Sequence, residues 1–157
     1  MWLVGLSGGL IACAQSSTQS QYSVSAARSS SDAAVILSAA IRHYLERDTA
    51  PASDSPNRLV VIDAGLFSEA VVARLSEFPV TTKAQIDLDP NVISPRDRSS
   101  GKPVVVWQAD VVHLEPSHGT VIIRCRFTPH SAFQDRVLFE LLNGKWVIVE
   151  VQNQWVT

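Results

Sequence analysis

The side chains that could carry out acid–base or metal chemistry are few in this sequence. A metal site needs three or four converging ligands, and nothing in the spacing of the histidines brings them together. Neither a phosphate-binding glycine loop nor a strained turn around a nucleophile is present. We therefore expect no metal and no cofactor, and we interpret the histidines as surface side chains: His43, His113, His118 and His130.

Two side chains are candidates for a catalytic base, Asp63 and His113. Asp63 follows the apolar run at residues 59–62, where burial would raise its pKa. The simpler interpretation is that its carboxylate accepts backbone hydrogen bonds in the turn before Gly65. His113 shares a predicted strand with Asp110, but a separation of three residues sends them to opposite faces. The two form a dyad only if a bulge intervenes.

An arginine pair, Arg124 and Arg126, alternates with apolar residues along a predicted strand. Both arginines therefore point to one face of a sheet, where they could capture an anionic ligand. The alternative is a ladder of cross-strand ion pairs. A one-residue bulge in the final hairpin would place Arg136 opposite Glu150 in such a ladder. We favour the ladder.

Three tryptophans lie in predicted strands: Trp107, Trp146 and Trp155. They either fill the core or line an apolar ligand site or partner surface. Trp155 lies in a polar, uncharged chain end, so we expect it to be exposed and a candidate for a protein contact.

The first residues suggest export. Residues 1–12 are uncharged and mostly apolar. As a helix they would reach about 18 Å, which is too short for a hydrocarbon core of about 30 Å but suits a secretory signal peptide. Leu10-Ile11-Ala12-Cys13 resembles the lipobox of bacterial lipoproteins. The resemblance implies cleavage before Cys13 and attachment of the membrane anchor, a lipid, to its thiol.

The lipobox resemblance implies a place in the cell envelope, on the periplasmic side, with the outer membrane favoured because Ala14 follows Cys13. Two alternatives stay open. Ala12-Cys13-Ala14 also fits ordinary signal cleavage, which would give a secreted soluble protein, or residues 1–12 are the first hydrophobic element of the fold. Lipidation of Cys13 leaves Cys125 without an intramolecular partner, so we expect no disulfide and a buried thiol.

Composition predicts one domain and argues against a nucleic-acid partner. The 157 residues carry a formal net charge of −2, and no segment concentrates positive charge. Residues 14–31 are rich in Ser and Gln and poor in apolar side chains, which predicts a flexible tether. We expect a signal peptide over 1–12, a lipidated cysteine with its tether over 13–31, and a single domain over 32–157.

The fold class that we predict is α+β, with two helices on a curved, mainly antiparallel sheet that ends in a four-strand meander. Apolar periodicity, turn residues and proline positions set the expected boundaries. These are a helix from Asp32 to about Glu46, a strand at Leu59–Asp63, a helix from Ser68 to about Phe78, a short strand at Ala84–Leu88, a long exposed loop at Asp89–Pro103, and strands at Val104–Leu114, Thr120–Phe127, Arg136–Leu142 and Trp146–Val156.

The final hairpin has the strongest local signal. Asn143-Gly144 suits a tight turn with positive φ. The segment from Phe139 to Val149, FELLNGKWVIV, resembles the last hairpin of cystatin-like and nuclear-transport-factor-two-like domains. That resemblance implies a cone-shaped fold, a curved sheet around a helix with a pocket between them. Members of these families include isomerases, dehydratases, immunity proteins and assembly modules.

The sequence favours a non-enzymatic binding module, carried by an exported lipoprotein, for an envelope protein or a small apolar ligand. One alternative is a cone-fold isomerase or hydrolase with an acidic or histidine base. The other is a structural module of an envelope or secretion assembly. Converging ionisable groups in one pocket would favour the enzyme, whereas an apolar pocket would favour the binding module.

Overall fold

The computed structural model describes residues 16–47, 58–88, 95–128 and 131–154. They form an α+β fold, as the sequence predicted, with a six-stranded sheet in the order β2-β1-β3-β4-β5-β6. The elements are α1 (Ser16–Arg47), β1 (Leu59–Asp63), a 3-10 turn (Gly65–Phe67), α2 (Ser68–Arg74), β2 (Val80–Thr82), a second 3-10 turn (Lys83–Gln85), β3 (Val104–Leu114), β4 (His118–Thr128), β5 (Ser131–Leu142) and β6 (Lys145–Gln154).

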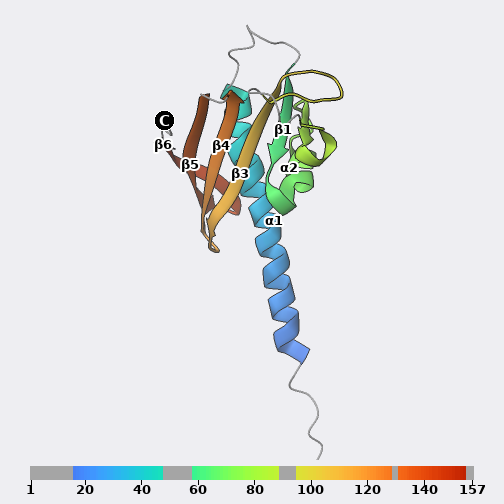
Figure 1. Cartoon of the computed structure of the whole chain (residues 1–157). Helices are drawn as coiled ribbons and strands as arrows, with labels where there is room; N and C mark the ends of the chain where they lie inside the picture. The colour runs from blue at the N-terminus through green and yellow to red at the C-terminus, as the bar shows by residue number, and fades with distance from the viewer. Residues whose placement is uncertain (1–15, 48–57, 89–94, 129–130, 155–157) are drawn as a thin grey trace, which may run out of the picture.

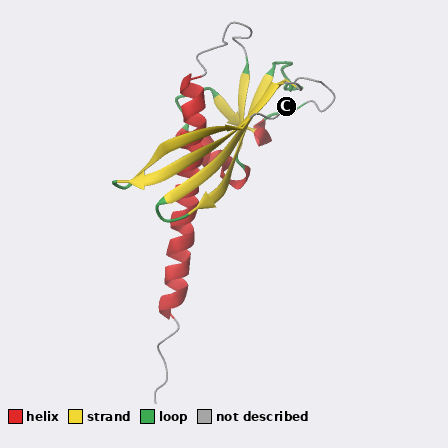
Figure 2. Cartoon of the chain, turned by 90° about the vertical axis from the view of Figure 1, so that its left-hand side faces the viewer, coloured by secondary structure: helices red, strands yellow, loops and turns green. Residues whose placement is uncertain are grey.

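The sheet combines a parallel and an antiparallel part (Figure 1). β1 runs parallel to both β2 and β3, and the connection from β1 to β2 passes through α2. β3 to β6 form the predicted antiparallel meander. Figure 2 shows the strands twisted relative to one another, with α1 lying across the sheet. Both helices contribute to one core cluster, so they cover the same face.

The core lies between α1 and the sheet. Along α1 the fully buried side chains recur with helical spacing, from Ile36 to Ile41, and they meet the buried Trp107 and Phe139 of the sheet. Gly119 allows the closest approach, because a Cβ there would lie 3.0 Å from Cδ1 of Ile36. α1 therefore packs almost directly on the backbone of β4.

The start of α1 corrects one prediction. The helix begins at Ser16 and not at Asp32, so residues 16–31 are helical where the sequence predicted a flexible tether. Residues 14–31 contain neither Gly nor Pro, and extending a nucleated helix adds one hydrogen bond for each residue fixed. Figure 1 shows the N-terminal part of α1 extending past the sheet. The predicted signal peptide and Cys13 lie outside the described residues.

The region between the two helices and the meander also differs from expectation. α2 ends at Arg74, four residues before the predicted Phe78. The strand predicted at Ala84–Leu88 is wrong: the strand is β2, and a 3-10 turn follows it. The β-branched run of β2 (Val-Thr-Thr) suits an extended strand better than the polar turn that follows it.

The predicted exposed loop at 89–103 is ordered around a buried carboxylate in its described part, residues 95–103. Asp97 is only 4% exposed and accepts hydrogen bonds from Ser99 Oγ (2.6 Å) and from the backbone N–H of Ser100 (2.9 Å). Hydrogen bonds from the Ser100 and Ser99 hydroxyls are the main reason why the pKa of Asp97 falls to about 2. The backbone N–H of Val104 donates to Pro95 O, which ties this turn to β3.

Candidate functional site

A cavity of about 280 Å³ opens between the C-terminal part of α1 and the strands β5 and β6. α1 contributes Tyr44, which continues the buried stripe of Ala40 and Ile41 at helical spacing. β5 contributes Phe133 and Asp135, which alternate towards α1 along the strand. The lining is completed by two residues of β6, Asn153 and Gln154. Gln154 borders the cavity while its side-chain oxygen accepts a hydrogen bond from Gln134.

A hydrogen bond between Tyr44 and Asp135 joins the two walls of this cavity. The Tyr44 hydroxyl donates to Asp135 Oδ2 at 2.5 Å, and Asp135 is 7% exposed. Burial raises the pKa of Tyr44, and its hydrogen bond to Asp135 raises that pKa further. Tyr44 therefore keeps its proton near neutral pH and serves as a donor.

The wall behind this hydrogen bond is aromatic. The Tyr44 ring centroid lies 5.4 Å from that of Trp107 and 5.5 Å from that of Phe133. Trp107 and Phe133 meet edge to face at 5.5 Å. Such tilted and edge-to-face arrangements are the favoured geometries of aromatic pairs. The rings give the cavity a stiff apolar side.

His43 precedes Tyr44 and corrects the expectation of a solvated surface histidine. Its ring packs edge to face on Tyr44 at 5.3 Å, and its Nε2 is buried without a hydrogen-bond partner among the described residues. Burial lowers the pKa of His43, and the charge of Arg47 lowers that pKa further. His43 is therefore neutral near pH 7.

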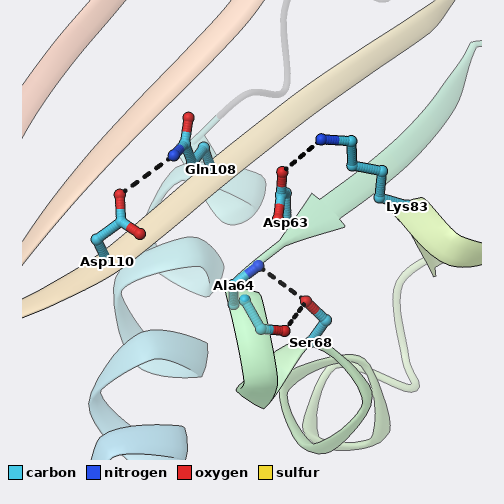
Figure 3. Close-up of polar contacts among 7 residues, drawn as sticks. Asp63, Ala64, Ser68, Lys83, Gln108 and Asp110 are labelled. Carbon is cyan, nitrogen blue, oxygen red and sulfur yellow. Dashed lines mark hydrogen bonds and ion pairs between the residues drawn. The ribbon is translucent and has the colours of Figure 1, made fainter.

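Asp63 forms an ion pair and does not cap the turn before Gly65. Lys83 Nζ lies 3.1 Å from Asp63 Oδ2 at the exposed end of β1. The turn is held by Ser68 instead: its Oγ accepts from the backbone N–H of Ala64 and donates to Gly65 O, both at 2.9 Å. Figure 3 shows the two interactions side by side. The predicted turn hydrogen bond of Asp63 is thus wrong.

A bulge does occur between Asp110 and His113, yet they form no dyad. The register of β3 shifts between Val111 and His113. His113 Nε2 lies 3.2 Å from Glu115 Oε1, whereas Asp110 accepts a hydrogen bond from Arg124 Nη1 at 2.8 Å. Each side chain therefore has a different charged partner, and neither lines the cavity.

Arg124 belongs to a polar ladder on the face of the sheet that points away from α1. It donates from Nη1 to Asp110 and from Nε to Gln134 Oε1 at 2.7 Å, and Gln134 in turn donates to Gln154 at 2.8 Å. Gln108 donates to Asp110 at 3.3 Å in the same ladder (Figure 3). The ladder accounts for the Arg124 guanidinium as the sequence favoured.

The register of the last hairpin differs from the expected one. Asn143 and Gly144 have φ of 51° and 76°, so they form a two-residue turn between β5 and β6 without a bulge at the turn. The register shift lies farther along, between Leu138 and Phe139. Arg136 therefore stands opposite Gln152, and not opposite Glu150. Arg126 stands opposite Val106 and Ala132.

Of the three candidate tryptophans, two belong to the core or pack against it, and the third lies outside the described residues. Trp107 is 2% exposed and belongs to both the core and the aromatic wall. Trp146 packs half-buried against the core. Cys125 is buried, as predicted. Trp155 lies outside the described residues, directly after Gln154 of the cavity.

The described residues hold no group of three His, Cys, Asp or Glu side chains that could bind a metal ion. None of the helices in these ranges combines the length and the apolar character needed to cross a bilayer. The cavity brings the ionisable side chains of Tyr44 and Asp135 together with the apolar ring of Phe133.

Sequence reasoning missed most of this cavity, although one signal was available. Asp135 alternates with Phe133, Val137 and Phe139 along β5. An acidic residue on the apolar side of a strand indicates either a buried partner or a site. The partner, Tyr44, is 91 residues away in the sequence.

Comparisons of the chain with protein-family models, with curated proteins and with solved structures found no match. The geometry of the cavity is therefore the basis for the function proposed below.

Proposed function

We propose that this chain is an exported, membrane-anchored lipoprotein whose α+β domain binds a small, mainly apolar ligand in the cavity between α1 and β5–β6. The observation that carries the binding role is the cavity itself. Aromatic rings form its wall, and a buried hydrogen-bonded pair, Tyr44 and Asp135, lies within it. Small-molecule sites in proteins combine an apolar lining with a few fixed polar groups in this way.

The anchoring role is supported by the lipobox-like Leu10-Ile11-Ala12-Cys13 and by the position of α1 (Figure 1). The first half of α1, residues 16–31, is about 24 Å long as a helix and extends past the sheet. A helix in this place would hold the binding domain clear of the membrane surface. The same segment was expected to be a tether, and the helix gives that spacing more stiffness.

The binding role is tested by blocking the cavity. The full chain with Cys13→Ala keeps every other residue and lacks the thiol, so it can be purified without detergent. In this background we expect benzyl alcohol to bind, and Asn153→Trp to lower its affinity at least about tenfold by filling the cavity. Calorimetric titration measures both affinities.

The matched control is Gln152→Trp. It places the same ring on the same strand, but one residue earlier and therefore on the opposite face of the sheet. Equal affinities in the two tryptophan variants would contradict binding in the cavity. So would the absence of measurable binding to the parent chain at millimolar ligand.

The anchor is tested separately by intact mass. Protein extracted from membranes should begin at Cys13 and carry the added mass of its acyl chains. Cys13→Ala should move the protein from the membrane fraction to the soluble fraction. An unmodified N-terminal segment 1–12 in the mature protein would refute the lipoprotein part of the proposal and leave the binding part standing.

A second candidate function is acid–base catalysis at the same cavity. It is favoured by the convergence of two ionisable side chains there, with Asp135 as the base in place of the expected Asp63 or His113. Against it, the Tyr44 proton already occupies one carboxylate oxygen. NMR spectra of the ligand during the titration separate the two functions: a binding module leaves the ligand chemically unchanged, whereas an enzyme converts it.

A further inference from the structure

The charge of Asp135 distinguishes this cavity from a purely apolar one. Asp135 is 7% exposed, and its hydrogen-bond donor, the Tyr44 hydroxyl, carries no charge. None of the ion pairs among the described residues includes Asp135. A buried carboxylate without a cation is costly, and proteins normally pair such groups.

The cationic groups near the cavity do not supply that pair. On α1, His43 packs on Tyr44 but is kept neutral by its burial. Arg47 occupies the last turn of α1 and is exposed, and its charge acts on both His43 and Tyr44. No ion pair among the described residues joins it to Asp135. On the sheet, Arg124 is engaged with Asp110 on the opposite face. Asp135 therefore faces the cavity without an ion-pair partner among the described residues.

The aromatic side chains of the cavity also favour a positively charged ligand. Tyr44 and Phe133 line the cavity with ring centroids 5.5 Å apart. The face of an aromatic ring attracts a cation, and the attraction is strongest when water is excluded. A ring pair beside a carboxylate thus offers a cation two kinds of favourable contact and offers an anion neither.

We infer that the ligand of this cavity is a small organic cation, a protonated amine or quaternary ammonium group on an apolar body. The inference rests on the proposed binding function and specifies its ligand class. The charged head lies against Asp135 and the apolar body against Phe133 and Tyr44. The cavity volume of about 280 Å³ limits the ligand to a small molecule. A neutral apolar ligand would bury the carboxylate further without compensating its charge.

The test compares two probes of similar shape, benzylamine, which is protonated at pH 7, and benzyl alcohol. Both are titrated calorimetrically into the full-length Cys13→Ala chain. We expect benzylamine to bind at least about tenfold more tightly, because its ammonium group donates a charged hydrogen bond to the Asp135 carboxylate. We expect Asp135→Asn, which keeps the shape and an acceptor for Tyr44, to abolish this preference.

The matched control is Asp110→Asn, which removes a carboxylate from the opposite face and should leave the preference intact. The comparison of the two probes on the parent chain needs no variant, so it supplies an answer if Asp135→Asn fails to fold. Equal affinities for the two probes would overturn the inference while leaving cavity binding in place. A preference that survives Asp135→Asn would overturn it too. Failure of both probes to bind would remove the proposed function together with the inference.

Discussion

The two faces of the meander differ in how their carboxylates are buried and paired. On the face away from α1, Asp110 is half-exposed and paired with Arg124 at 2.8 Å. On the face towards α1, Asp135 is buried and paired with a neutral hydroxyl. The outer pair lies in water, where its charges are screened and contribute little. The inner carboxylate lies among aromatic rings, where an unmatched charge matters more.

The two carboxylates therefore contribute differently to the stability of the sheet. A ladder of paired polar groups is what an exposed sheet face needs for solubility and register. A buried carboxylate beside a cavity stabilises the fold poorly, because its desolvation is incompletely compensated. The proposed ligand would compensate this cost.

The largest loss of stability is expected when a ring of the aromatic wall is removed. Trp107→Ala should destabilise the domain by about 3–5 kcal/mol, because it empties a fully buried core site behind the rings of Tyr44 and Phe133. Urea unfolding measures the loss. Gln108→Ala, the next residue and on the outer face, should change the stability by no more than about 0.5 kcal/mol. Similar losses for the two variants would contradict the contrast between the faces.

The second largest loss of stability is expected when the Tyr44 hydroxyl, which donates a hydrogen bond across the cavity, is removed. Tyr44→Phe keeps the ring and deletes the hydroxyl that donates to Asp135, which leaves a buried acceptor unsatisfied. We expect a loss of about 1–3 kcal/mol in the free energy of unfolding. Thr81→Val deletes a hydroxyl that hydrogen-bonds Gln85 at the surface and should cost less than about 0.5 kcal/mol. If Tyr44→Phe is as mild, Asp135 is not held as described.

The polar ladder on the face away from α1 should contribute little to the free energy of unfolding. Arg124→Gln removes the ion pair with Asp110, and we expect a loss of about 0–1 kcal/mol that shrinks at high salt. Denaturant unfolding at low and high ionic strength measures it. A loss as large as that of Tyr44→Phe, and insensitive to salt, would contradict a solvated outer face.

A third carboxylate, that of Asp97, extends the comparison to the dependence of stability on pH. Asp97 is held by hydroxyl and amide donors, and its folded-state pKa of about 2 lies below its ordinary value of 3.8. Protonation therefore favours the unfolded chain. The contribution of Asp97 to stability is complete above about pH 4 and is lost as the pH falls towards 2. In Asp97→Asn the unfolding free energy should fall less steeply over this window, and an unchanged slope would refute the assignment.

Much of the fold could be predicted because its signals are local. β1 and β3 have the predicted bounds, and the Asn143-Gly144 turn follows from the positive φ that these residues tolerate. The bulge near Leu138 moved the register of Arg136, since the sequence does not mark where a ladder absorbs an extra residue. α1 began early because the absence of Gly and Pro lets a packed helix extend over polar residues.

The cavity could not be predicted in the same way, because it depends on contacts between distant segments. Tyr44 was seen only as part of an apolar stripe, and Asp135 was not singled out. The residues that were singled out for chemistry, Asp63, His113 and Arg124, proved to have charged or polar partners at the surface. Isolated ionisable residues in a sequence are thus poorer guides than an acid placed in an apolar alternation.

The most direct measurement of the central claim is an NMR titration of the full-length Cys13→Ala chain with benzylamine, which follows side-chain signals from the two faces of β6. We predict saturating shifts for the Asn153 side-chain amide and the Tyr44 ring. The Gln152 side-chain amide, on the opposite face, should stay in place. Shifts that gather on Gln152, or that grow without saturation on both faces, would contradict a ligand site between α1 and the sheet.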